Sequence, residues 1–554
     1  MSHATRRLAC ALLATALAAG PGPAEATALT ILSVNDTHSS LDAAGPKDAS
    51  LDGTVGGLVK ASAVIARLRA EEPNTVFLHA GDLFMGDLYF NATFGSVELQ
   101  LLGLLGLDAM AVGNHELWFP GCVLAGSYLA AGGSFPLLAA NATPFECAGM
   151  VAPHALIGVG DLKIAVVGLT TPFDLPSQAN AAFTGGDDPP LGMLAAAQAA
   201  VAAARAVDED GDGVPDAQAV IVLSHLGQAL DEAIAANVIG VDAVVGGHDH
   251  YELAELVPGA SGRPVPVVHA GAYYRKVGRV RLDVEPTGVS AVSVDLVPVD
   301  RTVARPAPSP TSVPGTVALA VAQLQAAIPV IFAPFFPPPF EDPFHTPIAY
   351  AAGNVTNAIR FDAPKRDTGT GNLITDALRL RRPGTDLAFT VAGQTPQGIA
   401  EGPVVQEDLF RMVGVSFDPV TYFGTRIATG RIRGDVLLAA LELAIGISTA
   451  DDDYVPQLSG ARLVYDSSLA APPRIRSLEV GGVPVAPAAT YSIAMNAFVY
   501  QLLPSLGIEL VPGTGQVLDD FEFLALRDHV VALGTFESSG ENRVRDLAAR
   551  GPNR

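Results

Sequence analysis

Histidines and acidic residues gather in five short motifs across the first half of the 554-residue chain. Each motif follows an apolar run of the kind that forms a β-strand. In chain order the motifs are Asp36-Thr37-His38, Gly81-Asp82, Gly113-Asn114-His115-Glu116, Ser224-His225 and Gly247-His248-Asp249-His250. Imidazole nitrogens together with carboxylate and amide oxygens form a mixed ligand set that suits ions such as Zn²⁺ and Mn²⁺. The motifs therefore predict a metal centre assembled from distant segments.

The hydrophobic pattern predicts a scaffold that brings these segments together. From Leu29 to about Val299, strand-like runs alternate with amphipathic, helix-like stretches, which favours a layered α/β domain. The expected strands are 29–34, 75–78, 109–112, 163–167, 219–223 and 243–245, and the expected helices include 57–70, 97–105 and 192–207. Because open α/β sheets bind ligands at the carboxyl ends of their strands, the motifs occupy the expected positions for a shared site.

The second half of the chain predicts a second domain. Residues 301–315 are rich in Pro, Ser and Thr and indicate a linker, and 317–328 could form a helix. Residues 332–344 are dense in Pro and Phe, which we interpret as a packed loop or a domain contact. Another α/β pattern begins near 351. The expected organisation is a signal peptide at 1–26, a first domain at 27–300, a linker at 301–349 and a second domain at 350–554.

Composition limits the partners. The formal net charge is −24 and the pI is near 4.7, so the chain repels nucleic acid, and we expect no binding of a nucleic acid duplex. The same charge would repel a phosphate substrate unless metal ions or nearby arginines reversed it. No later segment is expected to span a membrane, because Gln323, Gln325 and Pro329 interrupt the apolar run from 317 to 332.

The N-terminus resembles a secretory signal. Arg6 and Arg7 precede an apolar stretch from Leu8 to Ala19, and Ala24-Glu25-Ala26 fits a small-residue cleavage pattern. We expect cleavage near Ala26 and a periplasmic or secreted protein. Cleavage would leave Cys122 and Cys147, an even pair that fits one disulfide in an exported protein. Two buried free thiols are the alternative.

In this order, the five motifs resemble the dinuclear metal centre of the calcineurin-like metallophosphoesterases. The resemblance implies two divalent ions, Mn²⁺ or Zn²⁺, that neutralise a phosphate ester and activate the attacking water. Asp36 and His38 stand two residues apart and can bind one ion together, and Asp82 is the natural carboxylate bridge. The other implied ligands are His250 for the first ion and Asn114, His225 and His248 for the second. His115 is implied as a catalytic group that stabilises the transition state or protonates the leaving oxygen.

Further segments resemble the 5′-nucleotidase branch of this family. They include Asn35–Ser39, Gly81–Gly86, Leu104–Ala109, Gly371–Ala377 and Thr429-Gly430. The resemblance implies a layered metallophosphoesterase β-sandwich flanked by helices, followed by an α/β substrate-binding domain. It also implies hydrolysis of nucleotides to nucleosides and phosphate, so the expected partner is a small-molecule phosphoester, in particular a nucleotide.

The chain departs from this branch at several positions. Trp118 stands where the 5′-nucleotidases carry an Asp that forms a dyad with the catalytic His. In the second domain, the resemblance implies Arg366 as a phosphate contact and Phe417 and Phe498 as rings that stack on the base. The usual Arg is missing from Ala392–Gln397, and Tyr500–Leu503 replaces a Gly-Gly-Asp-Gly segment. The nucleotide site is therefore expected to be incomplete.

An acidic loop precedes the strand that leads to His225. Asp208, Asp210 and Asp212 stand at alternate positions with a glycine, Gly211, for the turn, and a later acid, Asp216, could close a calcium site. The expected calcium is structural. The alternative is a solvated acidic loop.

Several functions remain open within these expectations. The chain could be a cyclic-nucleotide phosphodiesterase, a nucleotide-sugar hydrolase or a phosphoesterase for other esters. From another functional class, it could be a catalytically weak secreted protein that binds nucleotides or metals at a surface. Trp118 and the missing Arg favour the binding protein, whereas the complete set of metal ligands favours the enzyme.

Overall fold

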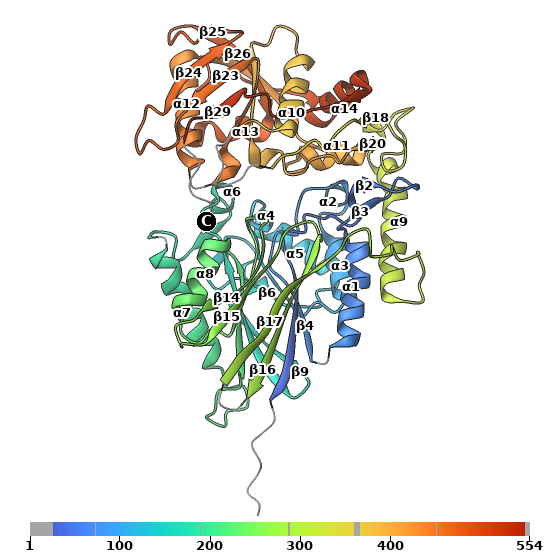
Figure 1. The fold of residues 1–554 in the computed structure, drawn as a ribbon, viewed down its shortest axis with the longest axis vertical. Coiled ribbons are helices and arrows are strands. Elements are labelled where there is room, and N and C mark those ends of the chain that lie inside the picture. Colours follow the sequence, from blue (N-terminus) through green and yellow to red (C-terminus); the bar gives the residue numbers. More distant parts are fainter. Residues whose placement is uncertain are drawn as a thin grey trace, which may run out of the picture.

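The N-terminal domain is a sandwich of two β-sheets (Figure 1). The computed structural model describes residues 26–548 apart from 73, 189, 286–287, 359–365 and 450, so the expected signal peptide up to residue 25 lies outside the described residues. The first sheet has the strand order β17-β16-β1-β4-β5-β6-β8, and the second has the order β14-β15-β13-β12-β10-β9.

The strands of the first sheet are β1 (Thr27–Val34), β4 (Thr75–His79), β5 (Ala109–Ala111), β6 (Leu137–Leu138), β8 (Val151–Ala152), β16 (Lys276–Glu285) and β17 (Gly288–Pro298). Those of the second are β9 (His154–Val159), β10 (Leu162–Thr170), β12 (Ala219–His225), β13 (Ala243–Gly246), β14 (Glu252–Pro258) and β15 (Pro264–Ala270). All six expected strands are confirmed within a few residues.

The central strands are apolar throughout because both of their faces are buried. In β1, Ile31 packs into the core between the sheets, and Leu32 packs into the core under the helices. Helices α1 (Leu58–Glu71) and α3 (Ser96–Leu104) cover the first sheet, and α7 (Leu191–Arg205) and α8 (Gln228–Asn237) cover the second. Burial on both sides explains why these strands appear in the sequence as continuous apolar runs.

Strand direction decides where the motifs meet. β1, β4 and β5 run parallel, as do β10, β12 and β13. The segments that leave β1, β4, β5, β12 and β13 therefore reach one end of the sandwich. That end faces the C-terminal domain (Figure 1).

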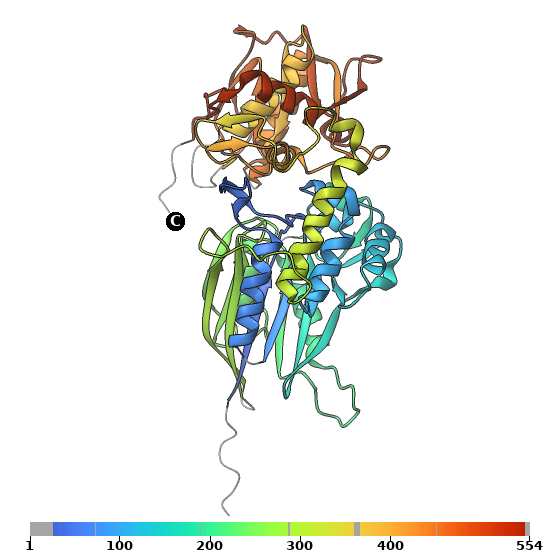
Figure 2. The ribbon, with the colours of Figure 1, turned by 90° about the vertical axis from the view of Figure 1, so that its right-hand side faces the viewer.

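A long helix connects the two domains (Figure 2). Helix α9 (Val313–Ile331) packs against α1 and α2 (Leu88–Thr93). It begins inside the stretch expected to be a linker, because the Ser312 side chain accepts the N–H of Gly315 at 3.2 Å and caps the helix. Among the described residues, α9 is the one helix long and apolar enough to cross a membrane by length and composition, and a third of its apolar window is buried in the fold.

The C-terminal domain is also α/β. Its main sheet has the order β22-β19-β26-β21-β27, with smaller sheets β25-β24-β23-β29 and β20-β18-β28 beside it. The strands are β18 (Ala349–Ala351), β19 (Leu387–Val391), β20 (Gly402–Val404), β21 (Arg426–Arg433), β22 (Pro456–Ser459), β23 (Ala461–Tyr465), β24 (Ile475–Val480), β25 (Val483–Pro484), β26 (Thr490–Asn496), β27 (Gln516–Phe521), β28 (Thr535–Phe536) and β29 (Val544–Asp546). The helices are α10 (Gly369–Arg381), α11 (Gln406–Val413), α12 (Gly434–Ile447), α13 (Ala497–Leu502) and α14 (Glu522–Leu533).

The domains are joined by a buried ionic contact and by aromatic rings. Arg411 of α11 is 2% exposed, and its Nε donates to Asp87 Oδ2 of the N-terminal domain at 2.7 Å. In the Pro- and Phe-rich segment, Phe335 stacks on Phe423 with ring centroids 4.0 Å apart. This segment therefore packs against the C-terminal domain, as its composition indicated.

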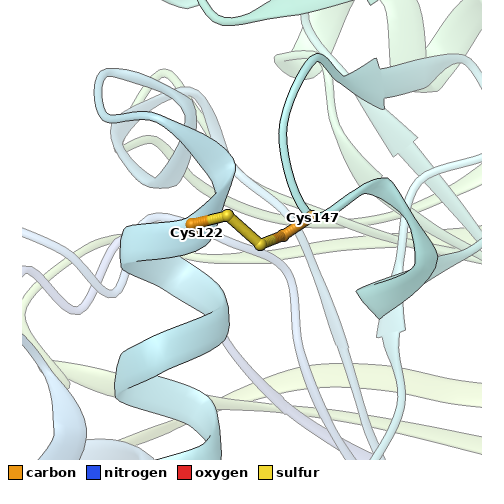
Figure 3. The surroundings of a disulfide bond; sticks show 2 residues. All are labelled: Cys122 and Cys147. Carbon is orange, nitrogen blue, oxygen red and sulfur yellow. A yellow bond between two sulfur atoms is a disulfide. The ribbon is translucent and has the colours of Figure 1, made fainter.

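One disulfide links Cys122 and Cys147, with their Cα atoms 5.1 Å apart (Figure 3). It joins the start of α5 (Gly121–Ala130) to the loop before Ala148–Met150. The structure thus favours the bonded pair over two free thiols. The bond anchors the chain just after the Gly113–Glu116 motif.

Candidate metal centre

The five motifs converge at the end of the sandwich. Asp36 and His38 follow β1, Asp82 follows β4, and His225 is the last residue of β12. Asn114 and His115 begin the short helix α4 (Asn114–Leu117) after β5, and His248 and His250 follow β13. All of the expected ligands except His248 and His250 are buried, and those two are partly exposed toward the cavity between the domains.

Their ligand atoms form two neighbouring groups. In one, His38 Nε2 lies 3.0 Å from His250 Nε2, which lies 3.7 Å from Asp36 Oδ1. In the other, His225 Nε2 lies 3.1 Å from both Asp82 Oδ2 and Asn114 Oδ1, and His248 Nδ1 lies 3.1 Å from the same Asn114 oxygen. Asp82 is within 4.8 Å of ligand atoms on both sides. The structure brings all seven expected ligands together, with Asp82 in the middle.

The backbone at this site is unusually constrained. Five of the seven candidate ligands have positive φ angles: Asp36 (49°), His38 (46°), Asp82 (57°), His248 (95°) and His250 (60°). Such angles cost free energy for residues other than glycine and persist where the surrounding structure enforces them. The motif glycine Gly113 has a separate role, because a Cβ there would lie 2.2 Å from Asp82 Oδ1. Glycine permits the close approach of these two segments.

Residues behind the ligands fix their orientation. The Glu116 carboxylate accepts the backbone N–H groups of Asp82, Leu83, Phe84 and Gly113 at 2.7–3.0 Å. Glu116 therefore points away from His115 and anchors the loop that carries Asp82. His225 Nδ1 lies 2.7 Å from the carbonyl oxygen of Ala80, which leaves its Nε2 directed at the cluster. Such supporting contacts hold metal ligands in place.

The charges of the cluster suit a bound cation. Burial raises the pKa of Asp36 to about 7, against the opposing effect of His225. Burial lowers the pKa of His225, but the Asp82 carboxylate outweighs this effect and raises it to about 10. Burial also lowers the pKa of His115 to about 3. Burial lowers the pKa values of His38, His248 and His250, so these imidazoles are neutral. A divalent ion could replace the proton of His225 as the positive charge beside Asp82, so the residues present fit divalent ions.

His115 lies beside the candidate ligands and lines the cavity between the domains. Its Nε2 is 3.8 Å from Asp82 Oδ2, and its backbone N–H donates to Asp82 Oδ1 at 2.9 Å. Trp118, which occupies the position of the expected Asp, stacks on the imidazole with centroids 4.1 Å apart. The indole Nε1 donates to Asp174 Oδ2 at 2.7 Å. The Asp174 carboxylate therefore accepts a hydrogen bond from the indole of Trp118 and not from the imidazole of His115.

The expected substrate residues lie elsewhere. Phe498 stacks on Trp118 at 5.0 Å, and Phe417 stacks on Phe119 at 5.4 Å. Arg366 is exposed and forms a backbone bridge with Arg545. The described residues that line the cavity do not include these three. In this arrangement of the domains, the three residues contact groups outside the cavity, and Phe498 is linked to His115 through Trp118.

Some of the residues that line the cavity were not indicated by the sequence. It measures about 370 Å³, and Arg275 is the one Lys or Arg side chain among the described residues that form it. Arg275 lies over the ring of Tyr273, which in turn contacts His38. The C-terminal domain contributes Asn357, Asp452 and Asp453 among others. No motif marks these positions, since they face the metal cluster only after the two domains have folded together.

The acidic loop brings three of its four expected ligands together. Carboxylate oxygens of Asp208, Asp210 and Asp212 lie within 4.8 Å of one another, and all three residues are exposed. Asp216 lies apart from them: its Oδ1 accepts from Lys163 Nζ at 2.7 Å and its Oδ2 from the N–H of Glu209 at 2.6 Å.

Comparisons with known proteins agree with this architecture. Residues 29–252 match the family model described as calcineurin-like phosphoesterase, and residues 347–501 match that of the 5′-nucleotidase C-terminal domain. The chain is 31% identical to the 5′-nucleotidase of Mus musculus over 295 residues, which cover 48% of each chain. It is 26% identical to a snake venom 5′-nucleotidase of Naja atra over 85% of this chain and 89% of that one.

A solved structure is similar over nearly the whole chain. The 5′-nucleotidase precursor of Thermus thermophilus matches with a TM-score of 0.76 and 26% identity, over 95% of this chain and all of that one. The chain spans about half the length of the mammalian 5′-nucleotidases that it matches.

Proposed function

Because the chain belongs to the family that joins a calcineurin-like phosphoesterase domain to a 5′-nucleotidase C-terminal domain, we propose that it is a metal-dependent phosphoester hydrolase acting on nucleotides. The observation that carries this proposal is the buried cluster of Asp, His and Asn side chains that faces the cavity between the domains. A cavity of about 370 Å³ is within the usual size of a small-molecule site.

The ligand assignment follows the two groups of atoms. Asp36, His38 and His250 would hold one ion. Asn114, His225 and His248 would hold the other, with Asp82 shared between them. Two divalent ions bound there would neutralise the phosphate and activate the attacking water. The mixed nitrogen and oxygen donors suit Mn²⁺ or Zn²⁺ and do not choose between them.

His115 is the proposed catalytic side chain. It is 9% exposed and lines the cavity, so its Nε2 can reach a phosphate oxygen or the leaving oxygen of a bound ester. A neutral imidazole at that position can donate a hydrogen bond to the developing negative charge, and a protonated one can protonate the leaving group. In either role, His115 contributes to turnover and not to the binding of the ions.

Fewer observations support the residues proposed to contact the substrate. Arg275 is placed to attract the anionic substrate into a cavity whose lining also includes several acids, among them Asp249 and Asp453. We also propose Arg366, Phe417 and Phe498 as nucleotide contacts in another arrangement of the domains. A base could stack on the two phenylalanines only after their present contacts with Trp118 and Phe119 had opened.

A phosphoester panel combined with metal analysis tests the proposal. With Mn²⁺, the purified protein should release phosphate from AMP, and His115→Ala should lower this turnover about 10²- to 10⁴-fold while retaining the metal. Release of p-nitrophenol from bis-p-nitrophenyl phosphate without activity on AMP would favour a phosphodiesterase. A cyclic nucleotide, a nucleotide sugar or another ester would then be the substrate to seek. A full metal complement without turnover on any ester would refute the enzyme and favour a binding protein.

We also propose that the protein is exported. The charged and apolar N-terminal segment supports this location, and so does the Cys122–Cys147 disulfide, since such bonds persist in oxidising compartments. Mass spectrometry of the mature protein would test cleavage near Ala26. A retained N-terminus would contradict the proposal.

The acidic loop is proposed as a structural calcium site. Three carboxylates within 4.8 Å of one another offer the oxygen ligands that Ca²⁺ prefers. The expected ligands are Asp208, Asp210 and Asp212. Asp216 would have to leave Lys163 to join them.

A further inference from the structure

His115 is oriented by ring contacts. Its Nδ1 is buried and has no hydrogen-bond partner among the described residues. The imidazole stacks on Trp118 with centroids 4.1 Å apart and 28° between the planes, and it makes an edge contact with His38 at 4.9 Å. In close-packed surroundings, the ring cannot turn about its Cβ–Cγ bond without displacing the indole. Removing the indole would therefore release His115.

Trp118 is itself held by two contacts. Its Nε1 donates to Asp174 Oδ2 at 2.7 Å, and the Asp174 side chain also caps helix α6 (Leu175–Gln178) by accepting the N–H of Ser177 at 3.0 Å. The indole also stacks on Phe498 at 5.0 Å with 16° between the planes. Asp174 belongs to the N-terminal domain and Phe498 to the C-terminal domain. The position of the indole therefore depends on both domains.

We propose that Trp118 is the positioning residue of His115, and that Asp174 and Phe498 hold Trp118 in place. The inference rests on the proposed role of His115 in turnover. The side chain that occupies the place of an expected carboxylate thus supports the imidazole by stacking. Because Phe498 comes from the other domain, the orientation of His115 is coupled to the docking of the C-terminal domain.

The neighbouring residue provides a matched control. Phe119 stacks on Phe417 across the same domain boundary, with centroids 5.4 Å apart and 20° between the planes. Its other ring contacts are with Phe84 and Phe90. Phe119→Leu therefore removes a similar contact between the domains without removing the ring that stacks on His115.

The test compares kcat on two esters, AMP and p-nitrophenyl phosphate, whose phenolate leaves without being protonated. Trp118→Leu should lower kcat on AMP by up to about 100-fold, the loss that a displacement of a catalytic group by about 1 Å can cause. A smaller fall on p-nitrophenyl phosphate would mean that His115 protonates the leaving oxygen, and an equal fall would mean that it stabilises charge on the phosphate; both results support the positioning role. Trp118→Phe should retain most of the activity, because it preserves the stack. In a His115→Ala background, Trp118→Leu should have no further effect, since it acts through His115.

Two results would overturn the inference. Equal losses for Trp118→Leu and Phe119→Leu would mean that Trp118 only holds the domains together. Losses that multiply in the double variant with His115→Ala would mean that Trp118 acts independently of His115. If the unaltered protein hydrolysed neither ester, the proposed function would fail instead. Crystal structures of the unaltered protein and Trp118→Leu would then decide, because an unmoved His115 ring would overturn the inference and a displaced ring would support it.

Discussion

The two domains differ in how firmly they hold the residues proposed for the site. On the N-terminal side, seven candidate ligands come from strand ends, five with positive φ angles, and Glu116 anchors the loop of Asp82 from behind. On the C-terminal side, Arg366 is exposed, and Phe417 and Phe498 are engaged by rings of the other domain. For the proposed hydrolase, this difference assigns the reaction to one domain and makes the choice of substrate depend on how the second domain docks.

The largest effect is expected from a substitution of Asp82, which lies in the middle of the N-terminal ligand cluster. Asp82→Asn should reduce phosphoester hydrolysis by at least about 10⁴-fold, because metal ions supply several kcal/mol of charge stabilisation. It should also lower the metal content measured by elemental analysis. Asp161→Asn, at an exposed turn of the same domain, is the control and should leave both values unchanged. Full activity in Asp82→Asn would refute the shared-ligand assignment.

The attachment of the second domain can be tested at Arg411. Arg411→Ala leaves Asp87 buried without its partner and should lower the free energy of unfolding by about 3–5 kcal/mol. Denaturant unfolding followed by far-UV circular dichroism would measure the change. The triple variant Arg411→Met/Asp87→Leu/Glu407→Gln should recover most of the loss, because it removes both buried carboxylates that pair with Arg411. A triple variant as unstable as Arg411→Ala would show that the hydrogen bonds of Arg411 to backbone carbonyls carry the stability.

Substitutions of two arginines can show whether the nucleotide binds in the present arrangement of the domains or in another one. Arg275→Ala should raise KM for AMP about tenfold with little change in kcat, as expected for the loss of one charge-assisted contact, and Arg366→Ala should raise it less. Steady-state kinetics at fixed ionic strength would measure both. The reverse order would mean that the nucleotide binds in a different arrangement, in which Arg366 reaches the phosphate.

The metal cluster could be predicted from the sequence because its ligands lie in short motifs directly after apolar strands. Parallel strands bring their carboxyl ends to one edge, so local pattern and topology agree for Asp36, Asp82 and His225. The contact of Trp118 with Phe498 could not be predicted in this way. It joins residues 380 positions apart through two rings that look like ordinary core residues. Arg411 and Arg275 were missed for the same reason, since each gains its role only from the docking of the domains.

The candidate calcium ligands of the acidic loop differ from the metal cluster, because no rigid strand ends hold them in place. Asp208, Asp210 and Asp212 lie close in sequence and are exposed, so their affinity for Ca²⁺ should be modest. A tenfold excess of Ca²⁺ over its Kd would add about 1.4 kcal/mol of stability, a rise of about 1 °C in Tm for a chain of this length. Differential scanning calorimetry should show this rise for the unaltered protein and not for Asp210→Ala. Asp216→Ala should keep the rise in Tm, because the Asp216 carboxylate is paired with Lys163. Loss of the rise in this variant would instead support the four-ligand site. Equal melting of the unaltered protein with and without Ca²⁺ would exclude calcium binding at this loop.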